Sequence, residues 1–323
     1  MTLTAPPKPP LSSPAVAAAP ARRRRPIGGS AATRTLFSES EIGRGRGRAA
    51  YWVVFTLVFL LFLAVFIFPL YWMFTSAVKT PEEYAQPDPT LFPQSWVPET
   101  YELAWDRMRI AKFFANTAFY ALGGWLIQLV IQVAAAYALS KLRPMFGKVV
   151  LGAMLASLML PATALLIPAY LTITDVPLVG WNLLNSPWAL WLPAVANAFN
   201  IYVLKRFFDQ IPNDLLDSAA IDGAGRFRIL WSIVLPLSRP VLGVVSIFSI
   251  VAIWKDFIWP LLVLQDTETQ TLSVALSRLA ATSQVPPTEL MAGLAIASVP
   301  MIVVFLVFQR SIIGGLAAGS MKG

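Results

Sequence analysis

Six apolar segments, each long enough to cross a lipid bilayer, divide most of this 323-residue chain. Hydrophobic residues make up 57% of it and charged residues 13%, well below the roughly one quarter that is typical of soluble domains. A hydrocarbon core of about 30 Å is crossed by a helix of about 20 apolar residues, so we predict an all-α polytopic membrane protein with about six transmembrane helices. The predicted spans cover about residues 51–76, 113–139, 149–173, 186–204, 235–264 and 290–308. Pro161 and Pro168 should bend the third span.

The beginning of the chain differs in composition from the rest. Residues 1–49 are rich in Pro, Ala, Ser, Gly and Arg, so we predict a disordered basic tail there and a transmembrane domain over residues 50–323. The basic run Arg22 to Arg25 does not adjoin an apolar stretch, which argues against a cleavable signal peptide. The run either attracts anionic lipid headgroups or, as we favour, is a topology signal that keeps the tail in the cytoplasm.

Basic residues are distributed unevenly between the two sides of the membrane. Six spans place both termini on one side, and a cytoplasmic N-terminus would put most Lys and Arg residues inside. The inner segments would hold the tail arginines with Lys141, Arg143, Lys148, Lys205, Arg206, Arg226, Arg228, Arg239, Arg310 and Lys322. The outer segments would hold Lys79, Arg107, Arg109, Lys112 and Arg278. This bias predicts a multi-pass protein of the cell membrane with both termini in the cytoplasm, and it explains the net charge of +8 without nucleic acid.

Two residue types that are common in catalytic sites are missing from the sequence. The chain has no His and no Cys, which excludes imidazole catalysis, disulfides and thiolate metal sites. No cluster of carboxylates resembles a metal site, and no G-x-x-x-x-G-K-[ST] phosphate loop is present. We therefore expect no catalytic residue, no metal ligand and no enzyme activity in this chain.

A polar interruption at residues 207–240 separates two apolar segments. Pro212 should stop a helix arriving from upstream, and Asn213 is the predicted N-cap of the next helix. Gly223 should end that helix, because glycine accepts the left-handed turn that closes helices. A second helical run is predicted over residues 227–234. The interruption is thus expected to form two short helices joined by a tight turn.

The spacing in this interruption resembles the EAA loop of ABC importer permeases. The family pattern is E-A-A, three residues, G, nine residues and then I-x-L-P. Here D-S-A occupies residues 217–219, Gly223 follows at the required distance, and I-V-L-P occupies residues 233–236. In that family the loop carries the coupling helix, which docks in a cleft of the ATP-hydrolysing subunit. The resemblance implies this role for Asp217, Ser218, Ala219, Ala220, Asp222, Gly223 and Ala224; an ordinary cytoplasmic helical hairpin is the alternative.

Further segments narrow the resemblance. They are N-A-F-N-I-Y-V-L-K-R-F-F at residues 197–208, D-G-A at 222–224, D-F-I-W-P-L at 256–261 and the final M-K-G. From about residue 51 to its end, the chain looks like the inner-membrane permeases of carbohydrate importers of the maltose/maltodextrin type. This implies a type I ABC importer permease core that translocates a sugar or oligosaccharide across the cytoplasmic membrane.

The same resemblance implies partners for the chain. They are a second permease subunit in a heterodimer, two ATPase subunits and an extracytoplasmic sugar-binding protein. ATP and Mg would bind to the ATPase subunits, so this chain itself would bind no cofactor. The small-residue tail after Gly314, ending in M-K-G, is expected to contact the ATPase subunits or to fray as a free terminus.

Charged residues inside a predicted span are candidates for a substrate pathway. Lys255 and Asp256 lie in W-K-D-F-I-W-P, and a charge at mid-span costs about 2.5–3.5 kcal/mol on insertion scales. Such residues usually face a cavity or a partner. Together with Trp254 and Trp259 they would suit a sugar, or they would form a salt bridge with the partner subunit or snorkel to the surface. The resembled family usually has Asn at the position of Lys255.

Paired amides form a second set of candidates. Asn197 and Asn200 are three residues apart in the predicted fourth span, and Gln128 and Gln132 are four apart in the second. Each pair either lines the pathway or joins helices through hydrogen bonds.

Two other classes of membrane protein remain as alternatives. An ion-coupled secondary transporter would be expected to show inverted repeats and ion-coordinating residues, and neither is found in the sequence. A membrane scaffold would have no ATPase partner for the interruption at residues 207–240.

Overall fold

The computed structural model describes residues 45–282 and 285–320, and the side chains of residues 48–282 and 285–309. The chain divides into two compact units, Met1–Leu63 and Ala64–Gly323. Most of the predicted tail, up to residue 44, lies outside the described residues, and residues 45–49 belong to the first helix.

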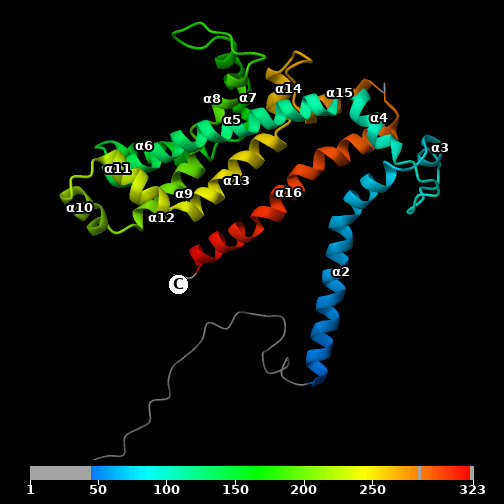
Figure 1. Ribbon diagram of the computed structural model, residues 1–323, viewed down its shortest axis with the longest axis horizontal. Helices are drawn as coiled ribbons and strands as arrows, with labels where there is room; N and C mark the ends of the chain where they lie inside the picture. The colour runs from blue at the N-terminus through cyan, green and yellow to red at the C-terminus, as the bar shows by residue number, and fades with distance from the viewer. Residues whose placement is uncertain (1–44, 283–284, 321–323) are drawn as a thin grey trace, which may run out of the picture. The chain divides into compact units, whose positions relative to one another are not determined.

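All regular elements of the described residues are helices, which confirms the predicted all-α fold (Figure 1). Those that begin before residue 180 are α2 (Gly45–Ser76), α3 (Pro81–Tyr84), α4 (Glu99–Arg107), α5 (Ile110–Tyr137), the π-helix η1 (Ala138–Leu142), α6 (Gly147–Ser157) and α7 (Ala162–Thr174). Those that follow are α8 (Pro187–Ala194), α9 (Ala198–Asp209), α10 (Asn213–Ile221), α11 (Arg226–Ile229), the π-helix η2 (Leu230–Val234), α12 (Leu235–Leu237), α13 (Arg239–Lys255), α14 (Ile258–Val263), α15 (Leu272–Thr282) and α16 (Pro287–Ser320).

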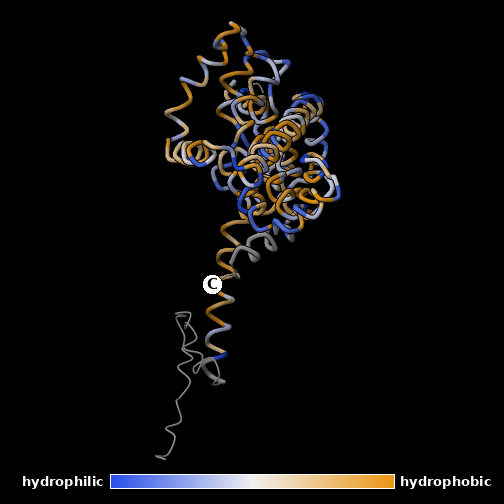
Figure 2. The backbone as a smooth tube through the Cα atoms, turned by 90° about the vertical axis from the view of Figure 1, so that its left-hand side faces the viewer, coloured by the Kyte–Doolittle hydropathy of each residue, from blue (hydrophilic) through white to orange (hydrophobic). Residues whose placement is uncertain are grey.

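Three of these helical segments are long and apolar enough to cross a membrane, namely 48–76, 110–142 and 287–309. Two further spans are counted if each of two bent helix pairs crosses as one unit. Hydrophobic residues dominate the helices, whereas hydrophilic residues gather in the connecting segments (Figure 2). The composition of the helices therefore supports a multi-pass membrane protein.

The two bent pairs differ in how well the sequence predicted them. α6 and α7 meet at 110°, and Pro161 takes an extended conformation between them, as expected for a bend at this proline. The second bend, of 83°, separates residues 226–237 from α13. It lies at Ser238, within the predicted fifth span of about residues 235–264, for which the sequence predicted no bend.

The fourth predicted span, residues 186–204, is interrupted in the structure. α8 ends at Ala194, and α9 begins at Ala198 after Asn197 in an extended conformation. The Asn197 side chain accepts a hydrogen bond from the backbone N–H of Asn200 at 3.0 Å and so caps α9. Two short helices therefore replace one span, and they are not among the candidate spans.

Helix α5 provides the central packing surface of the second unit, because α13, α9 and α8 all pack against it. The close approach of α8 and α13 to α5 depends on Gly123 and Gly124. A Cβ atom on Gly123 would lie 2.5 Å from the Trp191 ring, and one on Gly124 would lie 2.6 Å from Ile253. The Trp191 indole N–H also donates to the Tyr120 carbonyl at 2.9 Å.

The segment between α2 and α4 is organised around the buried side chain of Glu83. Its carboxylate accepts hydrogen bonds from the Thr90 hydroxyl (2.7 Å), the Gln94 N–H (2.9 Å) and both the N–H (3.2 Å) and hydroxyl (2.8 Å) of Ser95. Burial alone would raise the pKa of Glu83, but these bonds favour the ionised form and lower its pKa to about 2. The segment between α2 and α4 is therefore a folded element.

Candidate functional site

The interruption at residues 207–240 forms the predicted pair of short helices, α10 and then α11 with η2. Helix α9 ends at Asp209, three residues before Pro212, as the proline predicted. The predicted N-cap is wrong by one residue. Pro212 occupies the cap position in an extended conformation, and Asn213 is the first helical residue. The Asn213 side chain instead accepts a hydrogen bond from the Lys141 ammonium at 3.2 Å.

The predicted stop at Gly223 is confirmed by the backbone. Asp222 is the C-cap of α10, and Gly223 has φ +81°, a left-handed conformation that side chains with a Cβ rarely adopt. The Ala224 N–H then donates to the Ala219 carbonyl at 2.9 Å, which closes the turn. A Cβ on Gly223 would have no heavy atom within 4 Å, so this chain leaves open space beside the turn.

The α10 turn presents a largely exposed surface. Leu216 points into the core, while Asp217, Ser218, Ala220, Asp222 and Gly223 are exposed and Ala219 and Ala224 are half-buried. Two large apolar side chains in this surface were not predicted from the sequence. They are Ile221, which is 87% exposed, and Phe227, which is 80% exposed. The sequence could have identified these two residues, because they are large apolar residues within a polar segment. Such an exposed apolar patch is typical of a surface that binds a partner.

Polar contacts hold the start of this loop to the end of the α5–η1 span. Asp209 accepts hydrogen bonds from Ser140 and Lys205, each at 2.7 Å, and Lys141 donates to the Ile211 carbonyl at 2.8 Å. Burial by itself would raise the pKa of Asp209, but the hydrogen bonds and the nearby positive charges outweigh it and lower the pKa. An ionised carboxylate therefore links η1, α9 and the loop.

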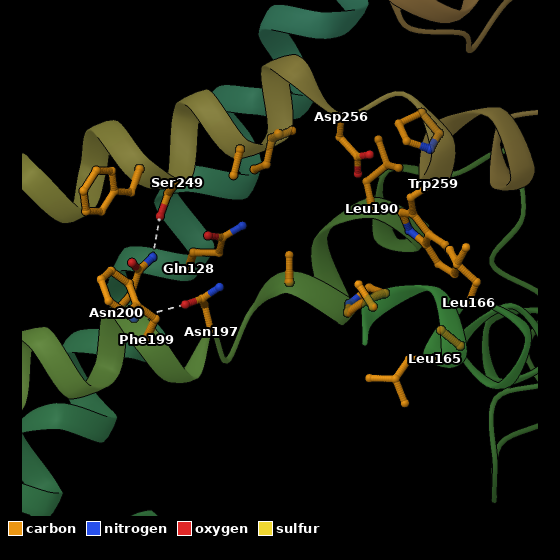
Figure 3. A pocket seen from close by; sticks show the side chains of 18 residues that line it. Gln128, Leu165, Leu166, Leu190, Asn197, Phe199, Asn200, Ser249, Asp256 and Trp259 are labelled. Atoms are coloured by element: carbon orange, nitrogen blue, oxygen red, sulfur yellow. Dashed lines mark hydrogen bonds between the residues drawn. The ribbon is translucent and has the colours of Figure 1, made fainter. Parts of the chain in front are cut away.

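Four of the six predicted pathway residues line one cavity of about 570 Å³. Asn197 and Asn200 come from the α8–α9 break and α9, and Asp256 and Trp259 come from the α13–α14 break and α14 (Figure 3). The Asn200 amide donates to the Ser249 hydroxyl at 3.3 Å. Asn200 thus joins α9 to α13 and also lines the cavity, so the two readings are compatible for Asn200, whereas Asn197 lines the cavity and caps its own helix.

The remaining two predicted residues lie elsewhere. Trp254 and Lys255 line a separate cavity of about 320 Å³, which shares no lining residue with the first. The α13 helix ends at Lys255, so Asp256 leaves it in an extended conformation and its side chain takes another direction. The sequence predicted one site from a run of neighbouring residues, and the end of the helix divides that run.

The larger of these two cavities offers hydrogen-bonding groups on an apolar wall. Gln128 and Ser249 add to the two asparagines, and Asp256 is the only ionisable residue that lines it. The Asp256 carboxylate also lies beside the backbone N–H groups of Phe257 and Trp259, at the start of α14. Uncharged polar groups beside an aromatic ring suit a hydroxyl-rich, uncharged molecule better than an anion.

The family model described as "Binding-protein-dependent transport system inner membrane component" matches residues 128–316. This match includes the α10 turn and every residue that lines the larger cavity. It therefore covers both candidate sites.

Individual proteins also resemble this chain over most of its length. Protein LplC of Bacillus subtilis (strain 168) is 30% identical over 84% of this chain and 95% of its own length. The diacetylchitobiose uptake system permease protein NgcG of Streptomyces coelicolor is 28% identical over 81% of this chain and 86% of its own length. The solved structure of a bacterial ABC transporter involved in the import of the acidic polysaccharide alginate superposes with a TM-score of 0.73. That match covers 85% of this chain and 99% of the solved chain at 23% identity, and shows a shared fold.

Proposed function

Because this chain belongs to the family of binding-protein-dependent transport system inner membrane components, we propose that it carries a sugar or oligosaccharide across the cell membrane. Family membership makes the chain a multi-pass transport subunit rather than an enzyme, and it disfavours an ion-coupled secondary transporter. The observation that carries the sugar assignment is the cavity of amide and hydroxyl groups beside Trp259. A relative that takes up diacetylchitobiose supports the same class of substrate.

The proposed assembly contains four kinds of protein. This chain pairs with a second permease, two ATPase subunits bind on the cytoplasmic side, and an extracytoplasmic binding protein delivers the sugar. Both termini then lie in the cytoplasm, in agreement with the bias of basic residues. ATP and Mg bind to the ATPase subunits, and this chain holds no cofactor.

The α10 turn is the proposed contact with an ATPase subunit. Asp217, Ser218 and Ala220 form its slim outer face, while Ile221 and Phe227 provide apolar area for binding. ATP-driven closure of the ATPase pair would move α10, and the polar link through Asp209 would pass that movement to α5 and α9. An ATPase can bias the permease between inward- and outward-open states only if it binds the two states unequally.

The proposed pathway includes the cavity around Asn197, Asn200, Asp256 and Trp259. The amides and the carboxylate would bind sugar hydroxyls, and the indole ring would pack on the apolar face of a pyranose. Trp254 and Lys255 line the smaller cavity, so their proposed contribution is to a different part of the membrane domain. The small-residue tail from Gly314 is also proposed to contact the ATPase subunits. Its residues 314–320 belong to α16, and residues 321–323 lie outside the described part of the chain.

Reconstitution tests this function. The full chain, co-expressed with its partner permease and ATPase subunits, would be placed in liposomes with ATP inside and binding protein with labelled saccharides outside. We expect ATP-dependent accumulation of a saccharide, and no accumulation when the binding protein is omitted. Uptake driven by an ion gradient without ATP would contradict the proposal.

A further inference from the structure

A third cavity is lined by residues of η1, α6 and α9. Within the second unit, α6 and α9 lie close to α10 and α11 (Figure 1). The volume of the third cavity is about 600 Å³, and η1, the following loop, the start of α6 and the last turns of α9 enclose it. It shares no lining residue with the cavity around Asp256. Because η1 closes the apolar segment 110–142, the third cavity lies where a span leaves the membrane.

Cationic groups dominate this cavity. Arg143, Lys148 and Lys205 line it together with one carboxylate, Asp209. The Lys205 ammonium lies 2.7 Å from Asp209, so these two charges offset each other. Arg143 and Lys148 are exposed and form no ion pair with any residue in the described part of the chain. The cavity therefore carries an uncompensated positive charge.

The Arg143 side chain has more hydrogen-bond donors than it uses within this chain. Its Nε donates to the Ser140 carbonyl at 3.3 Å, which leaves its terminal N–H groups for a ligand. Arg143 ends η1 in a left-handed conformation, and Lys148 lies in the first turn of α6 on the other side of the short loop. A planar guanidinium and a mobile ammonium that flank one space suit the oxygens of a phosphate group.

Apolar side chains surround the basic residues. Leu142, Met145, Phe146 and Val149 are all exposed, with 42%, 86%, 65% and 68% of their surfaces accessible. Leu139 and Leu151 form part of the cavity wall itself. A small soluble anion would leave these apolar surfaces uncovered, whereas a molecule with an anionic head and hydrocarbon tails would cover them.

We propose that the cavity between η1, α6 and α9 binds the phosphate group of an anionic phospholipid through Arg143 and Lys148. The acyl chains would lie against the exposed apolar residues of the loop and α6. Basic pockets between membrane helices on the cytoplasmic side are a recognised setting for such headgroups. The site is independent of the saccharide and lies next to the polar contacts that hold the α10 loop.

The test uses the full complex, purified with its partner subunits and stripped of lipid in detergent. Its thermal unfolding is followed while phosphatidylglycerol, phosphatidylcholine or inorganic phosphate is added in separate titrations. We expect phosphatidylglycerol to raise the unfolding temperature and phosphatidylcholine not to. The double variant Arg143→Gln/Lys148→Gln should need about 30-fold more phosphatidylglycerol, as the loss of two cationic contacts near the membrane surface implies.

The control variant Arg206→Gln/Arg239→Gln removes two exposed positive charges outside the cavity, in the last turn of α9 and at the start of α13, and it should titrate like the wild type. Arg143→Lys keeps the charge and should lose less affinity than the double variant, which distinguishes lost binding from misfolding. Equal titrations for the double variant, the control and the wild type would overturn the proposal. A full shift with inorganic phosphate alone, with no further effect of phosphatidylglycerol, would overturn the lipid as the ligand and assign the cavity to free phosphate.

Discussion

At the scale of single residues, Gly223 combines a left-handed backbone conformation with open space around its Cα. Its φ of +81° costs a residue with a Cβ roughly 1 kcal/mol or more, although no atom of this chain would collide with the side chain. We predict that Gly223→Asp inserts and pairs with its partner permease but loses the ATPase subunits, or binds them without transport. Two measurements check this prediction: the subunit content of the purified complex, and saccharide uptake.

The matched control for that variant is Gly225→Asp. Gly225 is also exposed with no neighbour within 4 Å, but its φ is −69°. It should keep clearly more uptake than Gly223→Asp, and Asp217→Ala should show a milder form of the Gly223→Asp defect. Wild-type uptake in Gly223→Asp would mean that this turn is not the coupling element.

Asp256 is the ionisable residue of the cavity around Asn197 and Trp259, and we predict that Asp256→Asn weakens saccharide uptake more than it weakens assembly. Loss of a hydrogen bond from a charged group corresponds to a loss of about tenfold or more in apparent affinity. The control is Lys255→Gln, its neighbour in the separate cavity. A different result would assign the carboxylate to assembly. In that case Asp256→Asn would lose the partner permease, and the fraction of complexes that stays assembled would take up saccharide at the wild-type rate.

At the scale of elements, the segment around Glu83 should depend on pH. Its pKa is lowered from 4.5 to about 2, so ionisation stabilises the folded loop fully above pH 4.5, and that contribution is lost as the pH falls towards 2. Hydrogen exchange of the Gln94 and Ser95 amides, corrected for intrinsic rates, should show protection that falls over this range. Glu83→Gln should show low protection throughout, and equal protection in the two proteins at pH 6 would contradict the role of the carboxylate.

Local signals predicted some elements well and others poorly. The Gly223 turn was predictable because its conformation depends on one residue type, and the bend at Pro161 because proline lacks a backbone N–H. The break at Asn197 was missed because an apolar run conceals a single capping residue. The separation of Lys255 from Asp256 was also missed, because it depends on where α13 ends rather than on composition.

At the scale of the whole molecule, the predicted orientation in the membrane can be tested by cysteine labelling. It has no cysteine, so single cysteines can be introduced without a background. Asp88 and Asp222 are both exposed, in the loop after α2 and in the α10 turn. A membrane-impermeant maleimide should label Asp88→Cys in intact spheroplasts and Asp222→Cys only in inside-out vesicles. The reverse pattern would invert the proposed topology.

The two breaks, at Asn197 and at Asp256, border the same cavity. Where a helix stops inside a membrane, its last carbonyl and first N–H groups lose their partners within the helix, and they are tolerated only beside protein or water. Part of the lining that a sugar would meet is therefore main chain. Alanine scanning removes side chains and leaves these atoms in place, so it should underestimate how much this cavity contributes to binding. Substitutions that make the broken helices continuous would reveal how much the main-chain atoms contribute to binding.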